Sequence, residues 1–194
     1  MNNRFVLAAA LAFAGCAPAP DAPARPPLEG ARIGGAFALT DQNGQAVTDR
    51  SFDGRYRLMY FGYTFCPDVC PVDMQNVGGG LRLLERSDPA LARRIVPVFV
   101  TVDPARDTPA VLKQFVAAFH PRMVGLTGSQ AAIDATVKAY GNYAKKGAVT
   151  PGGGYLMDHM NAVYLMDPAG KPLALIPADK GPEAVAAEVR KWAR

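Results

Sequence analysis

Two near-continuous apolar segments constrain the fold of this chain more than any other feature of its sequence. Residues 57–63 (RLMYFGY) and residues 95–102 (IVPVFVTV) show no alternation of polar and apolar side chains. Runs of this kind are typical of strands that are buried on both faces of a sheet. Pro97 lies inside the second run and indicates an edge or irregular position, because proline cannot donate a ladder hydrogen bond.

Helix signals lie between and after these two strands. A helix is predicted from Asp68 to Arg86, although Gly78–Gly80 in its middle cost about 3 kcal/mol of helix propensity relative to alanine. We therefore expect either a kink at these glycines or a second element packed very close to them. Two further helices are predicted where a hydroxyl side chain can cap the first turn, from Thr108 to about Phe119 and from Ser129 to about Tyr140.

Short strands, two hairpins and a closing helix complete the order of elements. Asn43-Gly44 between apolar alternations is a strong hairpin signal, and Asp167–Gly170 has the composition of a turn. The remaining predicted elements are a hairpin around residues 37–52, a strand at 124–126, a hairpin at 162–166 and 173–176, and a helix at 182–192. This order predicts an α/β domain with a thioredoxin-like fold and additional β-hairpins, extending from Ile33 to Arg194.

The first residues predict export and a lipid anchor. Residues 1–15 combine a charged start, an apolar run and small residues directly before Cys16, which is typical of a lipoprotein signal peptide. The apolar run is too short to span a bilayer, which takes about 20 residues. Residues 16–32 are rich in proline and alanine, and we interpret them as a semi-rigid linker after a lipidated Cys16. The expected location is the periplasmic side of a bacterial membrane, and the alternatives are an uncleaved signal anchor or an ordinary signal peptide.

The charge and the cysteine content of the chain limit the classes of function that it can have. The formal net charge of +4 is mild and no basic cluster is present, so no nucleic-acid partner is expected. We interpret Lys145 and Lys146 as part of a solvated loop. With Cys16 assigned to the anchor, two cysteines are left, Cys66 and Cys70. In an oxidising compartment, two such cysteines form a disulfide, a redox pair or a metal site.

The two cysteines lie where the first buried strand meets the first predicted helix. On a helix, a spacing of four residues places both sulfurs on one face, and Pro67 would occupy the first turn. A closed zinc site needs four ligands, whereas this chain offers two cysteines and two histidines besides Cys16. Soft thiolates together with an imidazole select Cu(I) and also tolerate Cu(II).

The sequence leaves the identity of the imidazole open. His159 falls in a polar turn that follows Gly152–Gly154 and precedes a predicted strand, so it is either a ligand or an ordinary loop histidine. His120 lies where a helix stops and is interpreted as a surface or helix-terminal residue.

Several charged side chains lie near these candidates in the sequence. One interpretation of Asp158 and Asp68 is that each is a weak oxygen ligand or a carboxylate that orients the imidazole ligand. The alternative is that both are plain solvated carboxylates. Asp103, Arg106 and Asp107 follow the second buried strand, and we interpret them first as groups that fix a loop by hydrogen bonds and second as part of a partner surface.

Four segments, taken together and in this order, resemble the Sco/SenC family. The first is the buried strand followed by Cys-x-x-x-Cys-Pro at residues 66–71. The other three are Val102–Pro109 (VDPARDTP), Phe119–Gly128 (FHP and GLTG) and Asp158–Gly170 (DH and YLMDPAG). The similarity covers nearly all of residues 33–194. Its order and spacing are far more specific than the cysteine pair alone.

The resemblance implies a copper metallochaperone, and it leaves a thiol-disulfide oxidoreductase activity of the same cysteines open. It implies that Cys66, Cys70 and His159 bind one copper ion, as Cu(I) or Cu(II), and that the chain delivers it to the dinuclear copper site of cytochrome c oxidase. The expected partners are the copper-site subunit of that oxidase, other periplasmic copper chaperones or thiol reductants, and the membrane through the lipid anchor.

Three other functions remain as alternatives for the same cysteines. A thiol-disulfide reductase acting on the cysteines of the oxidase copper site would use the same two sulfurs, although the usual redox spacing is one residue shorter. A peroxidase would need a threonine-containing peroxidatic motif that this loop lacks. A purely structural disulfide is the third alternative.

Overall fold

The computed structural model of the chain describes residues 25–149 and 152–194. Within them, seven strands form one sheet in the order β2-β1-β5-β4-β3-β8-β9. The parallel strands β3, β4 and β5 lie at its centre, and β1 and β8 pair with them in antiparallel direction. The strands are β1 (Ala38–Asp41), β2 (Ala46–Thr48), β3 (Tyr56–Gly62), β4 (Ile95–Thr101), β5 (Val124–Thr127), β8 (Val163–Met166) and β9 (Pro172–Ile176).

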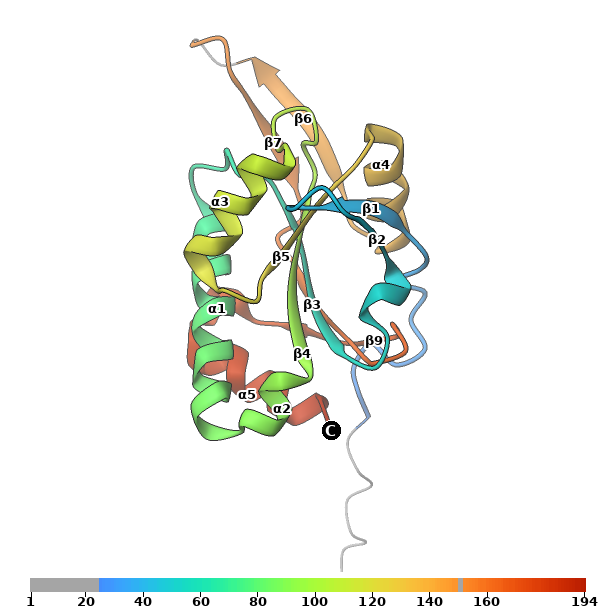
Figure 1. Cartoon of the computed structure of the whole chain (residues 1–194), viewed down its shortest axis with the longest axis vertical. Coiled ribbons are helices and arrows are strands. Elements are labelled where there is room, and N and C mark those ends of the chain that lie inside the picture. The colour runs from blue at the N-terminus through green and yellow to red at the C-terminus, as the bar shows by residue number, and fades with distance from the viewer. Residues whose placement is uncertain (1–24, 150–151) are drawn as a thin grey trace, which may run out of the picture.

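Helices cover both faces of this sheet (Figure 1). They are α1 (Val69–Ser87), α2 (Pro89–Arg93), α3 (Pro109–Phe119), α4 (Gln130–Ala139) and α5 (Pro182–Trp192). In Figure 1, α1, α3 and α5 lie on one side of the sheet and α4 lies on the other. All seven residues of β3 and all seven of β4 are buried as a result, as their apolar sequences predict.

Most predicted elements are present where the sequence placed them. The Asp41 Oδ1 atom accepts hydrogen bonds from the backbone N–H groups of Asn43 (2.8 Å) and Gln45 (2.9 Å), which closes the first hairpin. Thr108 caps α3 through the Val111 N–H, as predicted. The thioredoxin-like α/β fold with additional hairpins is confirmed.

The position of Pro97 corrects the expectation of an edge strand. β4 is central in the sheet, between β3 and β5. Pairing with β5 begins only at Val98, opposite Val124. β4 therefore has no partner strand on that side at Pro97, and a residue without an N–H costs no ladder hydrogen bond there.

The three glycines of α1 are explained by close packing. A Cβ atom on Gly78 would lie 2.5 Å from the carbonyl oxygen of Phe119, and one on Gly80 would lie 2.6 Å from Val185 Cγ1. The helix continues through the glycines to Ser87. Of the two expectations from the sequence, the close approach of other elements is confirmed.

The N-terminal predictions fall largely outside the described residues, since these exclude the predicted signal peptide (1–15) and Cys16. At the end of the predicted linker, the Leu28 N–H donates to the Leu173 carbonyl of β9 (3.0 Å), and Leu28 packs against the core. This end of the linker therefore contacts the domain and is not an extended spacer. Within the described residues, no helix combines the length and the apolar character that a membrane crossing requires.

A second, two-stranded sheet was not predicted. β6 (Ala144–Val149) and β7 (Tyr155–His159) form an antiparallel hairpin that pairs with no strand of the main sheet. His159 is the last residue of β7, so its assignment to a polar turn was wrong. Lys145 and Lys146, predicted to lie in a loop, are exposed residues of β6. In Figure 1 the hairpin extends from one end of the domain, the end at which β3 leads into α1.

Candidate metal centre

The cysteine segment begins where β3 ends. After Gly62 the chain turns, with the Cys66 N–H donating to the Tyr63 carbonyl (3.2 Å), and α1 starts only at Val69. Cys70 lies in the first turn of α1, whereas Cys66 and Pro67 precede it. The expectation that both cysteines share one face of a helix, with Pro67 in its first turn, was therefore wrong. The turn itself brings Cys66 back toward Cys70.

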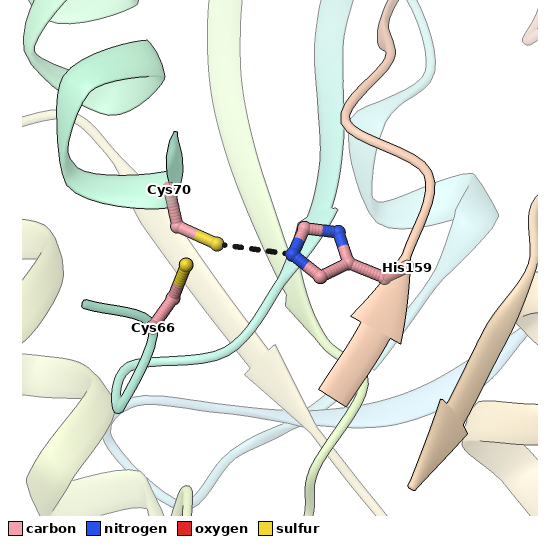
Figure 2. Close-up of side chains that lie close together, drawn as sticks. All are labelled: Cys66, Cys70 and His159. Atoms are coloured by element: carbon pink, nitrogen blue, oxygen red, sulfur yellow. Dashed lines mark hydrogen bonds between the residues drawn. The ribbon is translucent and has the colours of Figure 1, made fainter. Parts of the chain in front are cut away.

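The hairpin brings the third side chain to these two sulfurs. The Sγ atom of Cys70 and the Nε2 atom of His159 are 3.3 Å apart. The two sulfurs and one imidazole nitrogen all lie within 4.8 Å of one another. Figure 2 shows the three side chains pointing toward a common centre. Residues separated by almost ninety positions in the sequence thus converge at the end of a central strand, where open α/β sheets commonly bind ligands. Of the two histidines, His159 is the one at the cysteines.

Hydrogen bonding orients the imidazole of His159. Its Nδ1 atom lies 3.2 Å from the Met160 carbonyl oxygen, which can only accept, so Nδ1 carries the proton. The lone pair on Nε2 then faces the sulfurs, which is the tautomer that a metal ligand requires. Burial lowers the pKa of His159 and favours the neutral ring. The rings of Tyr60 and Tyr63 pack edge-on against it.

The two sulfurs differ in exposure. Cys66 is half-buried and Cys70 is fully buried, and they are not joined by a disulfide. Burial raises the pKa of the Cys70 thiol to about 12. Without a cation Cys70 is thus a thiol at neutral pH, and a metal that binds there must displace its proton.

Other candidates from the sequence lie at the margin of the site or away from it. Asp158 and Asp68 are exposed, and both line a cavity of about 410 Å³ that opens beside Cys66 and His159. Neither carboxylate orients His159, whose Nδ1–H donates to the Met160 carbonyl. His120 ends α3 as predicted, but it is buried: its Nδ1 accepts from the Arg122 N–H (3.2 Å).

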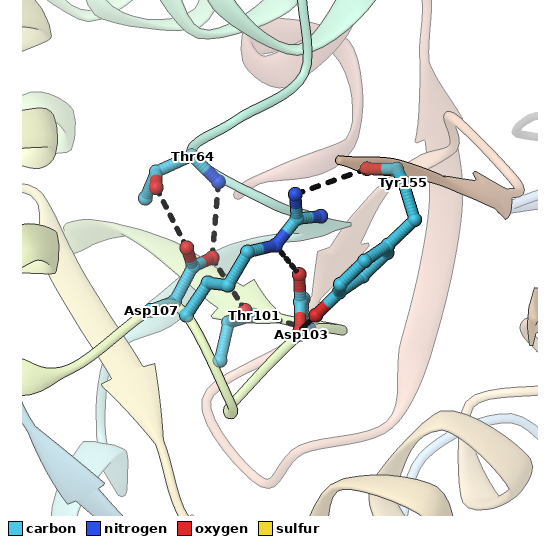
Figure 3. A network of polar contacts seen from close by, with 6 residues as sticks. Thr64, Thr101, Asp103, Asp107 and Tyr155 are labelled. Carbon is cyan, nitrogen blue, oxygen red and sulfur yellow. Dashed lines mark hydrogen bonds and ion pairs between the residues drawn. The ribbon is translucent and has the colours of Figure 1, made fainter. Parts of the chain in front are cut away.

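Asp107 fixes the cysteine turn, as the loop-fixing interpretation predicts. Its buried carboxylate accepts hydrogen bonds from the backbone N–H (3.0 Å) and hydroxyl (2.6 Å) of Thr64 and from the hydroxyl of Thr101 (2.6 Å). Figure 3 shows these bonds joining the end of β4 to the turn before Cys66. Burial raises the pKa of Asp107, and these three donors oppose that effect by stabilising the carboxylate.

Gly62 is a part of the site that sequence reasoning missed. A Cβ atom at this position would lie 2.7 Å from the Tyr60 ring and 2.9 Å from Cys70 Sγ. The space that Cys70 occupies therefore depends on the absence of a side chain at Gly62. The available signal was a glycine inside a strand of large apolar residues, which often marks a close approach.

We expect Gly62→Ala to weaken metal binding and to destabilise the fold. The added methyl group must push the Cys70 sulfur or the Tyr60 ring out of a fully buried position, and overpacking of this kind costs about 1–3 kcal/mol. Thermal unfolding and metal titration measure the two effects. Gly128→Ala is a matched control, since the atoms nearest to its Cβ would belong to Leu39 and Ala132, away from the site. Equal metal affinity in the two variants would contradict this role of Gly62.

Comparison with known protein families identifies one that covers the described domain. A family model described as SCO1/SenC matches residues 25–194. Protein SenC of Rhodobacter capsulatus is 43% identical over 160 residues, which are 82% of this chain and 70% of that protein. The mitochondrial protein SCO2 of Saccharomyces cerevisiae is 39% identical over 140 residues, and the match spans only 46% of its length.

Solved structures agree with the sequence comparison. ScoI of Bradyrhizobium japonicum with copper bound is 42% identical and matches with a TM-score of 0.74, covering 82% of this chain and 99% of that one. BsSco, described as a member of the Sco family of cytochrome c oxidase assembly proteins with a disulfide switch, is 26% identical with a TM-score of 0.59. That match covers 80% of this chain and 90% of BsSco.

Proposed function

The chain belongs to the SCO1/SenC family, and from this premise we propose that it is a copper metallochaperone. It binds one copper ion through Cys66, Cys70 and His159 and delivers it to the dinuclear copper site of cytochrome c oxidase. The observation that carries the proposal is the convergence of two sulfurs and one imidazole nitrogen within 4.8 Å.

The chemistry of these donors fits copper better than the other common metals. Two soft sulfurs and a neutral imidazole are a preferred set for Cu(I), and the imidazole also suits Cu(II). No fourth side chain completes a closed zinc site among the described residues that group with these three. A site with few ligands beside an open cavity also suits a carrier, because the cargo must be able to leave.

Copper stoichiometry tests this function. The protein is purified with Cys16→Ser, which leaves Cys66 and Cys70 as the only cysteines, and is reduced before titration. We expect one Cu(I) per chain, and a thiolate-to-copper absorption band when Cu(II) is added. Failure to retain copper against a weak chelator would contradict the proposal.

Thiol-disulfide exchange is a second candidate function, favoured by the difference in exposure between the two sulfurs. Cys66 is half-buried at the cavity and Cys70 lies directly behind it. This arrangement suits an attacking thiolate at Cys66 that forms a mixed disulfide with a target, which Cys70 then resolves. The target would gain two thiols and this chain would gain the Cys66–Cys70 disulfide. The disulfide switch described for BsSco supports keeping this alternative.

The cavity beside the site is where a partner would approach. Its walls come from the cysteine turn and the hairpin, and exposed apolar side chains stand around it, namely Val69, Tyr143 and Leu156. In our proposal the partner is the copper-site subunit of the oxidase, and other periplasmic copper chaperones or thiol reductants use the same opening.

The proposed location is the periplasmic side of a bacterial membrane. The signal sequence at residues 1–15 and the position of Cys16 support a lipid anchor, followed by the linker to the domain at about residue 33.

Cys16→Ser is expected to release the protein from the membrane. Without the thiol, no lipid can be attached, and the apolar run before it is too short to hold the chain in a bilayer. Cell fractionation followed by immunoblotting measures the change from membrane to periplasmic fraction. If the variant stays with the membrane after a high-salt wash, an uncleaved signal anchor is the better interpretation.

A further inference from the structure

The hairpin that carries His159 is tied to the domain by a small number of polar contacts. β6 and β7 pair only with each other, so no ladder hydrogen bond joins them to the main sheet. Ala144 and Met157 pack against the core, and His159 contacts Cys70. The other polar contacts that hold the hairpin are made at Tyr155, at the other end of β7. The Tyr155 carbonyl accepts from Arg106 Nη1 (3.0 Å), and the Tyr155 hydroxyl donates to Asp103 Oδ1 (2.9 Å). Figure 3 shows the first of these bonds as the dashed line that ends at the Tyr155 carbonyl.

Arg106 lies at the centre of this tie. Its Nε donates to the carboxylate of Asp103, which is only 4% exposed, and the Asp103 backbone is itself held by the Thr101 hydroxyl. The guanidinium carbon is 3.7 Å from the centroid of the Tyr155 ring and 4.9 Å from that of Phe65. A cation over aromatic faces is attracted to them, and more strongly when it is withdrawn from water.

The Arg106 guanidinium contacts both segments that form the candidate metal centre, the cysteine turn and the β6–β7 hairpin. Phe65 is the residue directly before Cys66, so the Arg106 contact reaches the cysteine turn. Tyr155 and His159 are both on β7 and, at an even spacing, point to the same face of the strand. Fixing Tyr155 therefore fixes the direction in which His159 leaves the strand, about 13 Å further along it.

We propose that Arg106, with Asp103 and Tyr155, is a positioning group that holds the β6–β7 hairpin against the cysteine turn and so sets the distance of His159 from the two sulfurs. This inference rests on the proposed function, since the positioned nitrogen is taken to be a copper ligand. Arg106 touches neither sulfur nor the imidazole in any hydrogen bond of the described residues, and it acts through the hairpin.

The test measures Cu(II) and Cu(I) affinity of Arg106→Ala in the Cys16→Ser protein. We expect the Cu(II) affinity to fall 10- to 100-fold, the range found for partners that orient metal ligands. The Cu(I) affinity should fall less, because the two sulfurs remain in place. Arg106→Lys should behave like Arg106→Ala, since lysine keeps the charge but loses the planar group that both stacks and bridges. Full rescue by lysine would overturn the proposal.

Making the Arg106→Ala change in a second variant, His159→Ala, separates the positioning role from a general effect on folding. In His159→Ala, the Arg106→Ala change should cause no further loss of Cu(II) affinity, because the nitrogen that it positions is already gone. Equal losses in both backgrounds would overturn the proposal. Arg122→Ala is the matched control: Arg122 also makes several bonds, to Glu85 and to the carbonyls of Ala92 and Ile95, and it should lower thermal stability without separating Cu(II) from Cu(I) affinity.

A measurement without copper keeps this inference distinct from the proposed function. In the metal-free protein, amide hydrogen exchange across β6 and β7 should become faster in Arg106→Ala, on the order of tenfold, while exchange in β3 and β4 stays unchanged. If the parent protein binds no copper but this change is seen, the proposed function fails and the positioning of the hairpin stands. If the parent binds copper and amide exchange across the hairpin is unchanged in Arg106→Ala, the positioning role is wrong and the proposed function stands.

Discussion

Copper binding is expected to be abolished when Cys66→Ser and Cys70→Ser are combined. Serine matches cysteine in shape but offers a hard, protonated oxygen in place of a polarisable sulfur, and Cu(I) selects the soft donor. Removing an orienting partner of a metal ligand already costs 10- to 100-fold in affinity, so the loss of two ligands should exceed about 100-fold. Competition with a Cu(I) chelator measures it.

The single variants show whether that loss reflects the metal or the fold. Cys70 is fully buried, and a hydroxyl placed there without a good partner costs about 1–3 kcal/mol of stability. Cys66 is half-buried, so Cys66→Ser should lose copper with little change in thermal unfolding. The Cys16→Ser parent is the control and should bind a full equivalent. Copper retained by the double variant would remove the basis of the proposed site.

His159→Ala is expected to separate copper delivery from thiol chemistry. Disulfide exchange needs only the two sulfurs, so the variant should still form and reduce the Cys66–Cys70 disulfide. Cu(II) depends more on imidazole than Cu(I) does, and it should be lost or change its spectrum first. Oxidase maturation at limiting copper should fall to the level of the cysteine variants.

His120 provides the control for His159→Ala, because it is the only other histidine of the chain. In His120→Asn, the amide oxygen can still accept the Arg122 N–H, so the end of α3 keeps its hydrogen bond. This variant should bind copper and support maturation. Full maturation by His159→Ala, with the cysteine variants inactive, would mean that copper does not pass through this histidine, and thiol-disulfide exchange would take its place.

Local patterns were enough to predict the strands of the main sheet and the four longer helices. The strands β3 and β4 are buried on both faces and read as continuous apolar runs, and Thr108 and Ser129 each accept the N–H that a cap should accept. The edge alternative for Pro97 was wrong because its environment depends on where β5 begins, a contact between distant segments. The sequence of a single strand does not determine which strands lie beside it in the sheet.

The candidate site was only partly predictable for a related reason. Cys66 precedes Pro67, a position that disfavours helical backbone, yet the spacing of the cysteines suggested a shared helix. The β6–β7 hairpin is short and mostly exposed, so Tyr155, Met157 and His159 alternate with polar and apolar neighbours without a strong strand pattern. The role of Gly62 depends on the approach of Cys70 from another element, which no local pattern contains.

The glycines of α1 restrict the movement of Cys70 more than that of His159. Phe119 and Val185 lie so close to Gly78 and Gly80 that a side chain at either glycine would collide with them. α1 therefore cannot slide or rotate past α3 and α5 without a clash. Cys70, in the first turn of this helix, therefore has a fixed position, and under the proposed function it would be a stationary ligand. The hairpin pairs with no strand of the main sheet and is held at Tyr155 by side-chain contacts with Arg106 and Asp103, so the nitrogen is the donor that can withdraw. Exchange of the ion with a partner would then proceed in a fixed order, with His159 leaving first and the sulfurs holding the cargo until the partner's own donors replace them.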